Sequence, residues 1–180
     1  KAGIAASEVG LVFSGDLLNQ CIGSSFTLRN LGIPHIGLYG ACSTMSESLG
    51  LASLLCASGA AQFCSAVSSS HFCSAERQFR FPLDYGGVRP PTSQWTVTGS
   101  GAAIISQSGS GPHIEAYTLG RAVDYSISDA NNMGAAMAPA AVDTLCTHFA
   151  ETGRSPRDYD LILTGDLGLV GRQIFRDLMM

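Results

Sequence analysis

Short apolar runs alternate with helix-like segments along the first 70 positions of the chain. Runs typical of buried strands occur at residues 9–14, 35–39 and 63–69. Between them, residues 22–31 and 43–58 have the spacing of helices, and each of these segments is followed by a glycine. Strand and helix therefore alternate with short connectors, which predicts an α/β fold built from parallel βαβ units.

The second part of the chain is less regular. Residues 71–91 are polar and aromatic, and a segment of this length is typical of a functional loop or an interface. Further strands are predicted at 94–98, 102–107, 114–123 and 160–164, with the first two joined or bent at Gly99-Ser100-Gly101. Helices are predicted at 133–149, despite Pro139, and from 172 to the last residue.

A short internal repeat links the two parts. Residues 9–17 align with residues 159–167, and each copy ends in Gly-Asp-Leu. The repeat predicts two related α/β halves in one mixed, mostly parallel arrangement. We therefore expect residues 1–112 to form a first half without its first strand-helix unit, and residues 113–180 to begin a truncated second half, so that the chain is a fragment.

Composition and charge exclude some functions. The chain has 180 residues, of which 46% are hydrophobic, and no apolar run approaches the length of a membrane span. A net charge of −4 argues against a nucleic-acid partner. The six cysteines lie mostly in apolar or small-residue segments and form no Cys-x-x-Cys pair, so we expect reduced thiols rather than a disulfide framework or a zinc site.

The segment 36–50 is the most informative of the chain. An apolar strand tightens through Gly40 and Ala41 and presents Cys42 where a helix begins. A helix N-terminus is positive, so it favours a thiolate and equally offers backbone N–H groups to a bound anion. The residues alone therefore leave open whether this turn builds a nucleophile or an anion site.

Five segments together resemble a known family. They are residues 14–20 (SGDLLNQ), 39–44 (YGACST), 74–82 (SAERQFRFP), 97–102 (VTGSGA) and 133–141 (MGAAMAPAA). Jointly they are similar to the stage V sporulation protein AD family, within the thiolase and β-ketoacyl synthase superfamily. The resemblance spans nearly the whole chain.

The resemblance implies a thiolase-like αβαβα layered fold and a role in endospore formation. Members of the family bind dipicolinic acid and support its uptake, with calcium, into the developing spore. The expected partners are dipicolinic acid and other stage V sporulation A proteins, inside the sporulating cell at the inner spore membrane. No cofactor is expected besides calcium that accompanies the ligand, and a homodimer is a further expectation.

A dicarboxylate needs N–H or hydroxyl donors, a cation and flat apolar walls. The candidate ligand-binding residues are Cys42, Ser43, Thr44, Ser69, Ser70, His71, Arg77, Gly99 and Ser100. For three of these side chains the residues leave a structural alternative open. Cys42 is then a small residue that fits a tight turn, His71 is an ordinary loop histidine, and Arg77 anchors a loop through Glu76. Asp16, at the end of the first strand, either coordinates calcium or stabilises a turn.

The alternative function is enzymatic. Cys42 corresponds in the resemblance to the acyl-accepting cysteine of thiolases, which would make the protein an acyltransferase or condensing enzyme. The histidine base of such a site comes from the second half of the fold. We therefore expect ligand binding without turnover.

Overall fold

The computed structural model describes residues 2–17, 21–70, 87–95 and 98–180. The chain divides into two compact units. The first contains Lys1–Ala75 and Val97–Glu115, and the second contains Glu76–Thr96 and Ala116–Met180. The expected boundary between two thiolase-like halves at position 112 stays a prediction.

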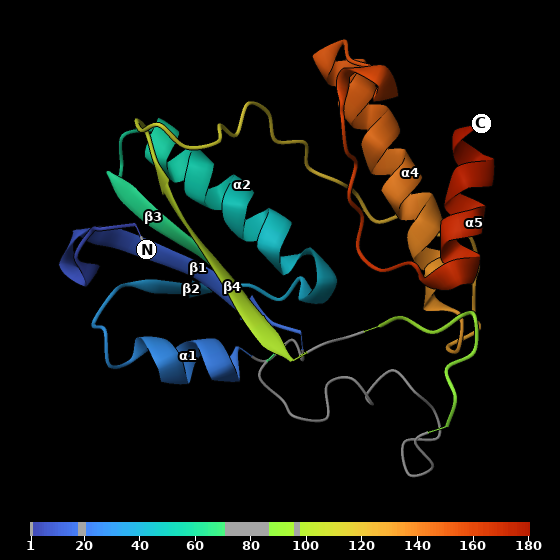
Figure 1. Ribbon diagram of the computed structural model, residues 1–180, viewed down its shortest axis with the longest axis horizontal. Helices are drawn as coiled ribbons and strands as arrows, with labels where there is room; N and C mark the ends of the chain where they lie inside the picture. Colours follow the sequence, from blue (N-terminus) through green and yellow to red (C-terminus); the bar gives the residue numbers. More distant parts are fainter. Residues whose placement is uncertain (1, 18–20, 71–86, 96–97) are drawn as a thin grey trace. The chain divides into compact units, whose positions relative to one another are not determined.

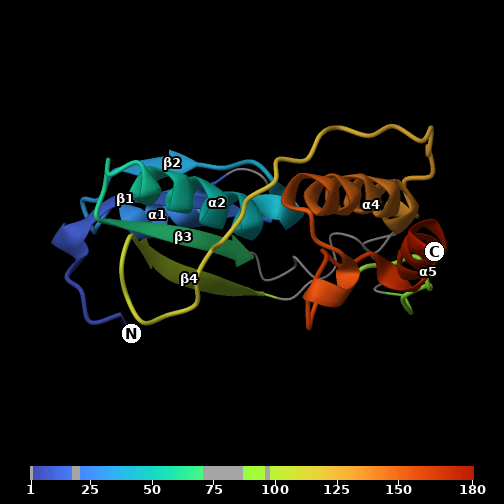
Figure 2. The same ribbon diagram turned by 90° about the horizontal axis from the view of Figure 1, so that it is seen from above.

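The first unit is a layered α/β structure. Its elements are η1 (Ala6–Glu8), β1 (Val9–Asp16), α1 (Ile22–Leu28), β2 (His35–Gly37), η2 (Ala41–Ser43), α2 (Thr44–Ala57), β3 (Phe63–Ser70) and β4 (Gly99–Ser106). The sheet has the order β2-β1-β3-β4, in which β1 is parallel to both neighbours and β4 is antiparallel to β3. Helices α1 and α2 cover opposite faces of the sheet (Figures 1 and 2). The predicted α/β class and the mostly parallel sheet are confirmed.

The core lies between α2 and the sheet. Every fourth residue of α2 is buried, at Thr44, Ser48, Ala52 and Cys56, which puts one helical stripe against the strands. The core cluster consists of Phe13, Leu38, Ala52, Cys56, Cys64 and Ala66. Burial, together with the adjacent Cys56 thiol, raises the pKa of the Cys64 thiol from 9.0 to about 12. Cys64 therefore stays a neutral thiol at physiological pH, and it is one of the cysteines of the described residues that are free.

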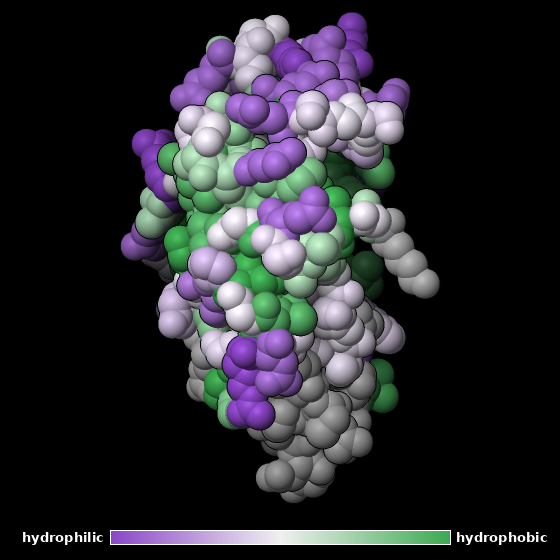
Figure 3. Space-filling model, turned by 90° about the vertical axis from the view of Figure 1, so that its left-hand side faces the viewer, coloured by the Kyte–Doolittle hydropathy of each residue, from purple (hydrophilic) through white to green (hydrophobic). Residues whose placement is uncertain are grey.

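The opposite face of the sheet is less completely covered. A cavity of about 520 Å³ lies between the sheet, α1 and the N-terminal segment, and its lining includes Ile4, Val12, Leu28, Val67 and Ile104. Hydrophobic residues gather in the middle of the side shown in Figure 3, between hydrophilic ones. An apolar patch of this kind is typical of a surface that another element or another molecule covers.

The glycine motif of β4 corrects one prediction. We expected two strands bent at Gly99-Ser100-Gly101, but the motif lies inside one continuous strand. Gly99 pairs with Ser70 and Gly101 pairs with Ser68 in the antiparallel ladder with β3. Glycine does not interrupt the strand here because its backbone takes part in the ladder like that of its neighbours, and the predicted strand at 94–98 is not formed by the described residues of that range.

The second unit is mainly helical. It contains α4 (Met133–Thr152), η4 (Pro156–Asp158) and α5 (Gly168–Met179). Helices α4 and α5 meet at two glycines, since a Cβ atom on Gly171 would lie 2.7 Å from the Cα atom of Gly134. This close approach requires glycine on both helices.

Two strands predicted for the later part of the chain are absent. Residues 114–123 and 160–164 are described and are irregular. Leu161 and Leu163 are 70% and 81% exposed, and Ile162, which would face the other way in a strand, is 36% exposed, so neither face of the second segment is well covered. A strand needs neighbours for its backbone hydrogen bonds, and neither segment pairs with another strand among the described residues. The helices predicted at 133–149 and from 172 are found, each longer than expected.

The helices give no sign of a membrane span. Within the part of the chain that the structure describes, no helix is both long enough and apolar enough to cross a bilayer.

Candidate anion-binding site at the start of α2

The turn between β2 and α2 is built by close backbone packing. Leu38 extends the parallel pairing beyond β2, because its N–H donates to the carbonyl oxygen of Ser14 at 2.8 Å. Ala41 has a φ of 47°, in the left-handed region that non-glycine residues rarely adopt. The short helix η2 follows and leads directly into α2. The chain thus turns sharply and starts α2 at the carboxyl edge of the parallel strands.

Cys42 lies in η2 and its side chain is exposed. The hydroxyl of Ser43, the next residue, donates to the Gly40 carbonyl oxygen at 3.0 Å, which closes the turn. The first amides of a helix lack intrahelical acceptors and carry partial positive charge. The predicted placement of Cys42 and Ser43 at the start of a helix is confirmed.

Thr44 is the unusual residue of this turn. Its side chain is 1% exposed, and its Oγ1 atom has no hydrogen-bond partner among the described residues. Its Cγ2 atom packs against β1, where a Cβ atom on Gly15 would lie only 2.9 Å away and would also overlap the Leu38 carbonyl. A buried hydroxyl without a partner costs free energy, so its persistence points to a ligand or to a role beyond packing.

Glu47 places a carboxylate at the same turn. It lies in the first turn of α2, and its Oε2 atom would be 2.6 Å from a Cβ atom on Gly40. Glu47 is not among the site residues predicted from the sequence. Its place in the first turn of the predicted helix was the available signal, because acidic side chains are favoured at the positive end of a helix.

Asp16 organises the end of β1. It is fully buried, and its Oδ2 atom accepts from the Gly23 N–H at 2.8 Å. Its Oδ1 atom accepts from the hydroxyls of Ser24, at 3.0 Å, and Ser69. The carboxylate therefore ties β1 to the start of α1 and to the end of β3. Calcium coordination by Asp16 stays untested.

The serines at the strand ends lie on two faces of the sheet. Ser69 pairs with Ser100, and the Ser69 hydroxyl points to Asp16 on the side of α1. Ser70 and its partner Gly99 alternate to the other face, where α2 packs. A cavity of about 250 Å³ is lined at this edge by Gly23, Thr27, Ser69, Ser70, Thr98, Gly99 and Ser100.

The structure therefore divides the candidate residues. Cys42, Ser43 and Thr44 begin the helix that covers one face, whereas Ser69, Ser70, Gly99 and Ser100 all line the cavity beside α1. His71 and Arg77 lie outside the described residues. Ligand binding by all of these residues stays a prediction.

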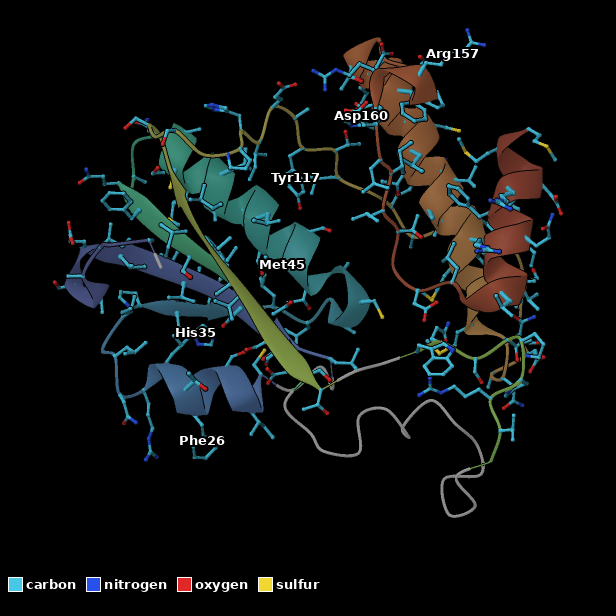
Figure 4. The ribbon with its side chains drawn as sticks, viewed as in Figure 1. Phe26, His35, Met45, Tyr117, Arg157 and Asp160 are labelled. Atoms are coloured by element: carbon cyan, nitrogen blue, oxygen red, sulfur yellow. The ribbon has the colours of Figure 1, made fainter. Side chains whose placement is uncertain are left out.

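A second feature of the strand ends was not foreseen. The Ser14 hydroxyl and the Nε2 atom of His35 lie 2.7 Å apart and join β1 to β2. The Cys21 thiol donates to the Leu38 carbonyl at 3.2 Å. Figure 4 shows His35 on β2 and Met45 in the first turn of α2. These bonds fix the backbone from which the turn departs, and only the register of the sheet could have revealed them.

Comparison with known proteins agrees with the resemblance. The sequence profile of the family Stage V sporulation protein AD (SpoVAD) matches residues 1–180. The Stage V sporulation protein AD of Bacillus subtilis (strain 168) is 46% identical over 179 residues, which cover 99% of this chain and 53% of that protein. The chain thus spans about half the length of this curated relative.

Solved structures show the fold. AbyA1, a tetronic acid condensing enzyme, is matched with a TM-score of 0.68 and 16% identity over 99% of this chain and 62% of that one. A variant of OleA from Xanthomonas campestris is matched with a TM-score of 0.68 and 11% identity, over 99% of this chain and 58% of that one. A 3-oxoacyl-(acyl-carrier-protein) synthase III is matched with a TM-score of 0.62 and 17% identity, over 99% of this chain and 63% of that one. The fold is therefore thiolase-like.

Proposed function

Because the chain belongs to the Stage V sporulation protein AD family, we propose that it serves sporulation by binding dipicolinic acid on a thiolase-like scaffold. The ligand carboxylate is received at the start of α2. The observation that carries this proposal is the buried Thr44 hydroxyl, which has no partner among the described residues although it lies in the first turn of a helix.

The chemistry of this turn suits a carboxylate. The amides at the start of α2 point along the helix axis and bear partial positive charge, which stabilises an anion. A carboxylate oxygen can accept from an amide and, once the buried Thr44 side chain turns toward the helix end, from its hydroxyl as well, and such charge-assisted bonds are stronger than neutral ones. Binding then satisfies a hydroxyl that has no partner among the described residues.

Glu47 affects how tightly an anion binds at the start of α2. Its carboxylate lies at Gly40, where it competes with an incoming anion for the same positive helix end. A ligand carboxylate must displace Glu47, or a calcium ion that arrives with the ligand must bridge the two carboxylates. Calcium prefers oxygen donors of this kind. Asp16 is less suited to this role, because both of its oxygens already accept hydrogen bonds from the protein.

Calorimetric titration with dipicolinate tests the proposal. We expect saturable heat from the wild-type chain and about tenfold weaker binding by Thr44→Val, since the loss of one charge-assisted bond is worth about 1.4 kcal/mol. Thr144→Val, a matched change in α4, should bind like the wild type. Glu47→Gln should bind the calcium-free dianion more tightly. The absence of saturable heat with and without calcium would refute the proposal.

An acyl-accepting role for Cys42 is the second candidate. It is favoured by the exposed thiol at the start of α2 and by the condensing enzymes among the structural neighbours. Incubation with acyl-CoA and intact-mass measurement test it. An adduct lost in Cys42→Ala and kept in Cys146→Ala, which changes the other exposed cysteine of the described residues, would support acyl transfer. No adduct with any acyl chain would eliminate it.

The proposal also covers the location of the protein, its protein partners and its oligomeric state. We place the protein at the inner spore membrane, beside other stage V sporulation A proteins, and we propose a homodimer as its form in solution. The uncovered apolar surface of the first unit supports an association of this kind. Light scattering that reports a monomer at all concentrations would remove the homodimer from the proposal.

A further inference from the structure

Residues 87–95, the described segment before β4, are held in place by other residues of the second unit. The Pro91 carbonyl oxygen accepts from the amides of Leu169, at 3.0 Å, and Val170, at 3.3 Å, at the start of α5. The Asp166 carboxylate accepts from the Trp95 N–H and, at 2.9 Å, from the Gly168 N–H. The backbone on both sides of this turn is therefore held by α5 and by the residues just before it.

This attached segment presents an aromatic ring to solvent. Trp95 is the only tryptophan of the chain, and its side chain is 70% exposed. The neighbouring Gln94 is buried, and its Nε2 atom lies 3.6 Å from the Met137 sulfur, so the backbone is fixed immediately before the indole. A large apolar ring that is both exposed and held in place has little entropy to lose when it binds a partner.

One face of the indole is already occupied. The guanidinium carbon of Arg89 lies 3.5 Å from the centroid of the Trp95 ring. The exposed area therefore belongs to the other face and to the ring edge. The face of an aromatic ring is normally negative, and a cation stacked on one side offsets part of that negative potential. The outer face of Trp95 is for this reason better suited to an anion than an isolated indole would be.

We propose that the outer face of Trp95 is a stacking site for planar aromatic carboxylates. Arg89, Trp95 and the ligand ring form a three-layer stack in which the ligand is the anion. This site lies on the second unit and is separate from the start of α2. The proposal for Trp95 rests on the proposed function only for the choice of ligand class, because dipicolinate is a planar aromatic dicarboxylate.

The fluorescence of the single tryptophan tests the site directly. Dipicolinate and benzene-1,3-dicarboxylate should change the Trp95 emission saturably, whereas the saturated cyclohexane-1,3-dicarboxylate should bind about tenfold more weakly. Arg89→Leu should weaken the fluorescence-detected binding about tenfold. Tyr125→Ala, which removes another exposed aromatic side chain of the second unit, should leave it unchanged.

Two variants separate this site from the start of α2. Thr44→Val should keep the full fluorescence response to dipicolinate, although calorimetry shows that binding at the start of α2 is about tenfold weaker. Trp95→Phe keeps an aromatic face and should retain binding by calorimetry, whereas Trp95→Ala should lose about tenfold in affinity at this site, with the circular dichroism of both compared with wild type. Equal binding of the saturated and planar acids, or loss of the fluorescence response in Thr44→Val, would overturn the proposal.

Discussion

Replacement of Thr44 by valine should stabilise the unliganded protein. The side chain is 1% exposed and its hydroxyl oxygen has no partner among the described residues. A buried polar group left in this state costs about 1–3 kcal/mol. Valine keeps the Cγ2 methyl that packs against Gly15 and replaces the hydroxyl with a methyl group of similar size. We therefore expect the free energy of unfolding to rise by about 1–2 kcal/mol.

Urea denaturation measures this change, and it should appear as a higher midpoint with an unchanged slope. In thermal unfolding, a chain of this length should gain about 2–4 °C for each kcal/mol. Ser48→Ala provides the matched contrast one turn later in α2. The buried Ser48 hydroxyl donates to the Thr44 carbonyl at 2.6 Å, so its loss should destabilise the protein by about 1 kcal/mol.

The outcome bears on function as well as on folding. A side chain that lowers the stability of the free protein and raises its affinity for a carboxylate is typical of a binding site. If Thr44→Val destabilises the protein by more than about 0.5 kcal/mol, the hydroxyl contributes to folding and the reasoning from its missing partner fails.

Three further predictions concern the scaffold. Asp16→Asn should lower the free energy of unfolding in urea by about 2–3 kcal/mol, because the buried carboxylate accepts hydrogen bonds from Gly23, Ser24 and Ser69 that a neutral amide cannot all replace; a loss below about 1 kcal/mol would contradict this. Gly171→Ala should cost about 1–3 kcal/mol through overlap with Gly134, whereas Gly101→Ala, which has open space around it, should be nearly neutral; equal effects would disprove the close contact. Because the pKa of the Cys64 thiol is raised from 9.0 to about 12 in the folded protein, the free energy of unfolding should fall as the pH rises from about 9 to 12, by at most about 1.4 kcal/mol per pH unit. Cys64→Ala should remove this contribution to the pH dependence.

The sequence predicts the first unit well because local and long-range signals agree there. Gly59 follows the C-cap of α2 with a φ of 77°, the left-handed conformation that ends a helix, whereas α1 ends at Leu28, before the predicted residue 31, and Gly32, with a φ of 64°, lies in the turn beyond it. Short apolar runs correctly indicate β1 and β3. These features depend on the residues of each segment alone, so they can be seen without the fold.

Features that depend on neighbouring segments could not be predicted in this way. Residues 160–164 have the same pattern as β1, yet only β1 has strands on both sides, and the pairing rather than the pattern decides whether a strand forms. Ser69 and Ser70 are adjacent in sequence, but the alternation of a strand sends them to opposite faces. The glycine motif of β4 predicts a bend because glycine often interrupts strands, whereas in the structure it lies within the ladder.

The repeated Gly-Asp pair has one feature that can be predicted from its own residues and one that cannot. Asp16 accepts from the Gly23 N–H at the start of α1, and Asp166 accepts from the Gly168 N–H at the start of α5. The motif therefore places an aspartate at the start of a helix in both copies, as its chemistry leads one to expect. The strand that precedes it forms only in the first copy, where neighbouring strands are present.

The central claim is that the first residues of α2 receive a carboxylate of dipicolinate. An amide-resolved NMR titration of the isotope-labelled chain tests it most directly. We predict that the amide signals of Cys42, Ser43 and Thr44 shift together and saturate with one dissociation constant, and that Thr44→Val weakens this response about tenfold. If these three amides keep their positions while dipicolinate shifts signals elsewhere in the protein, the carboxylate binds at another site and the claim is wrong.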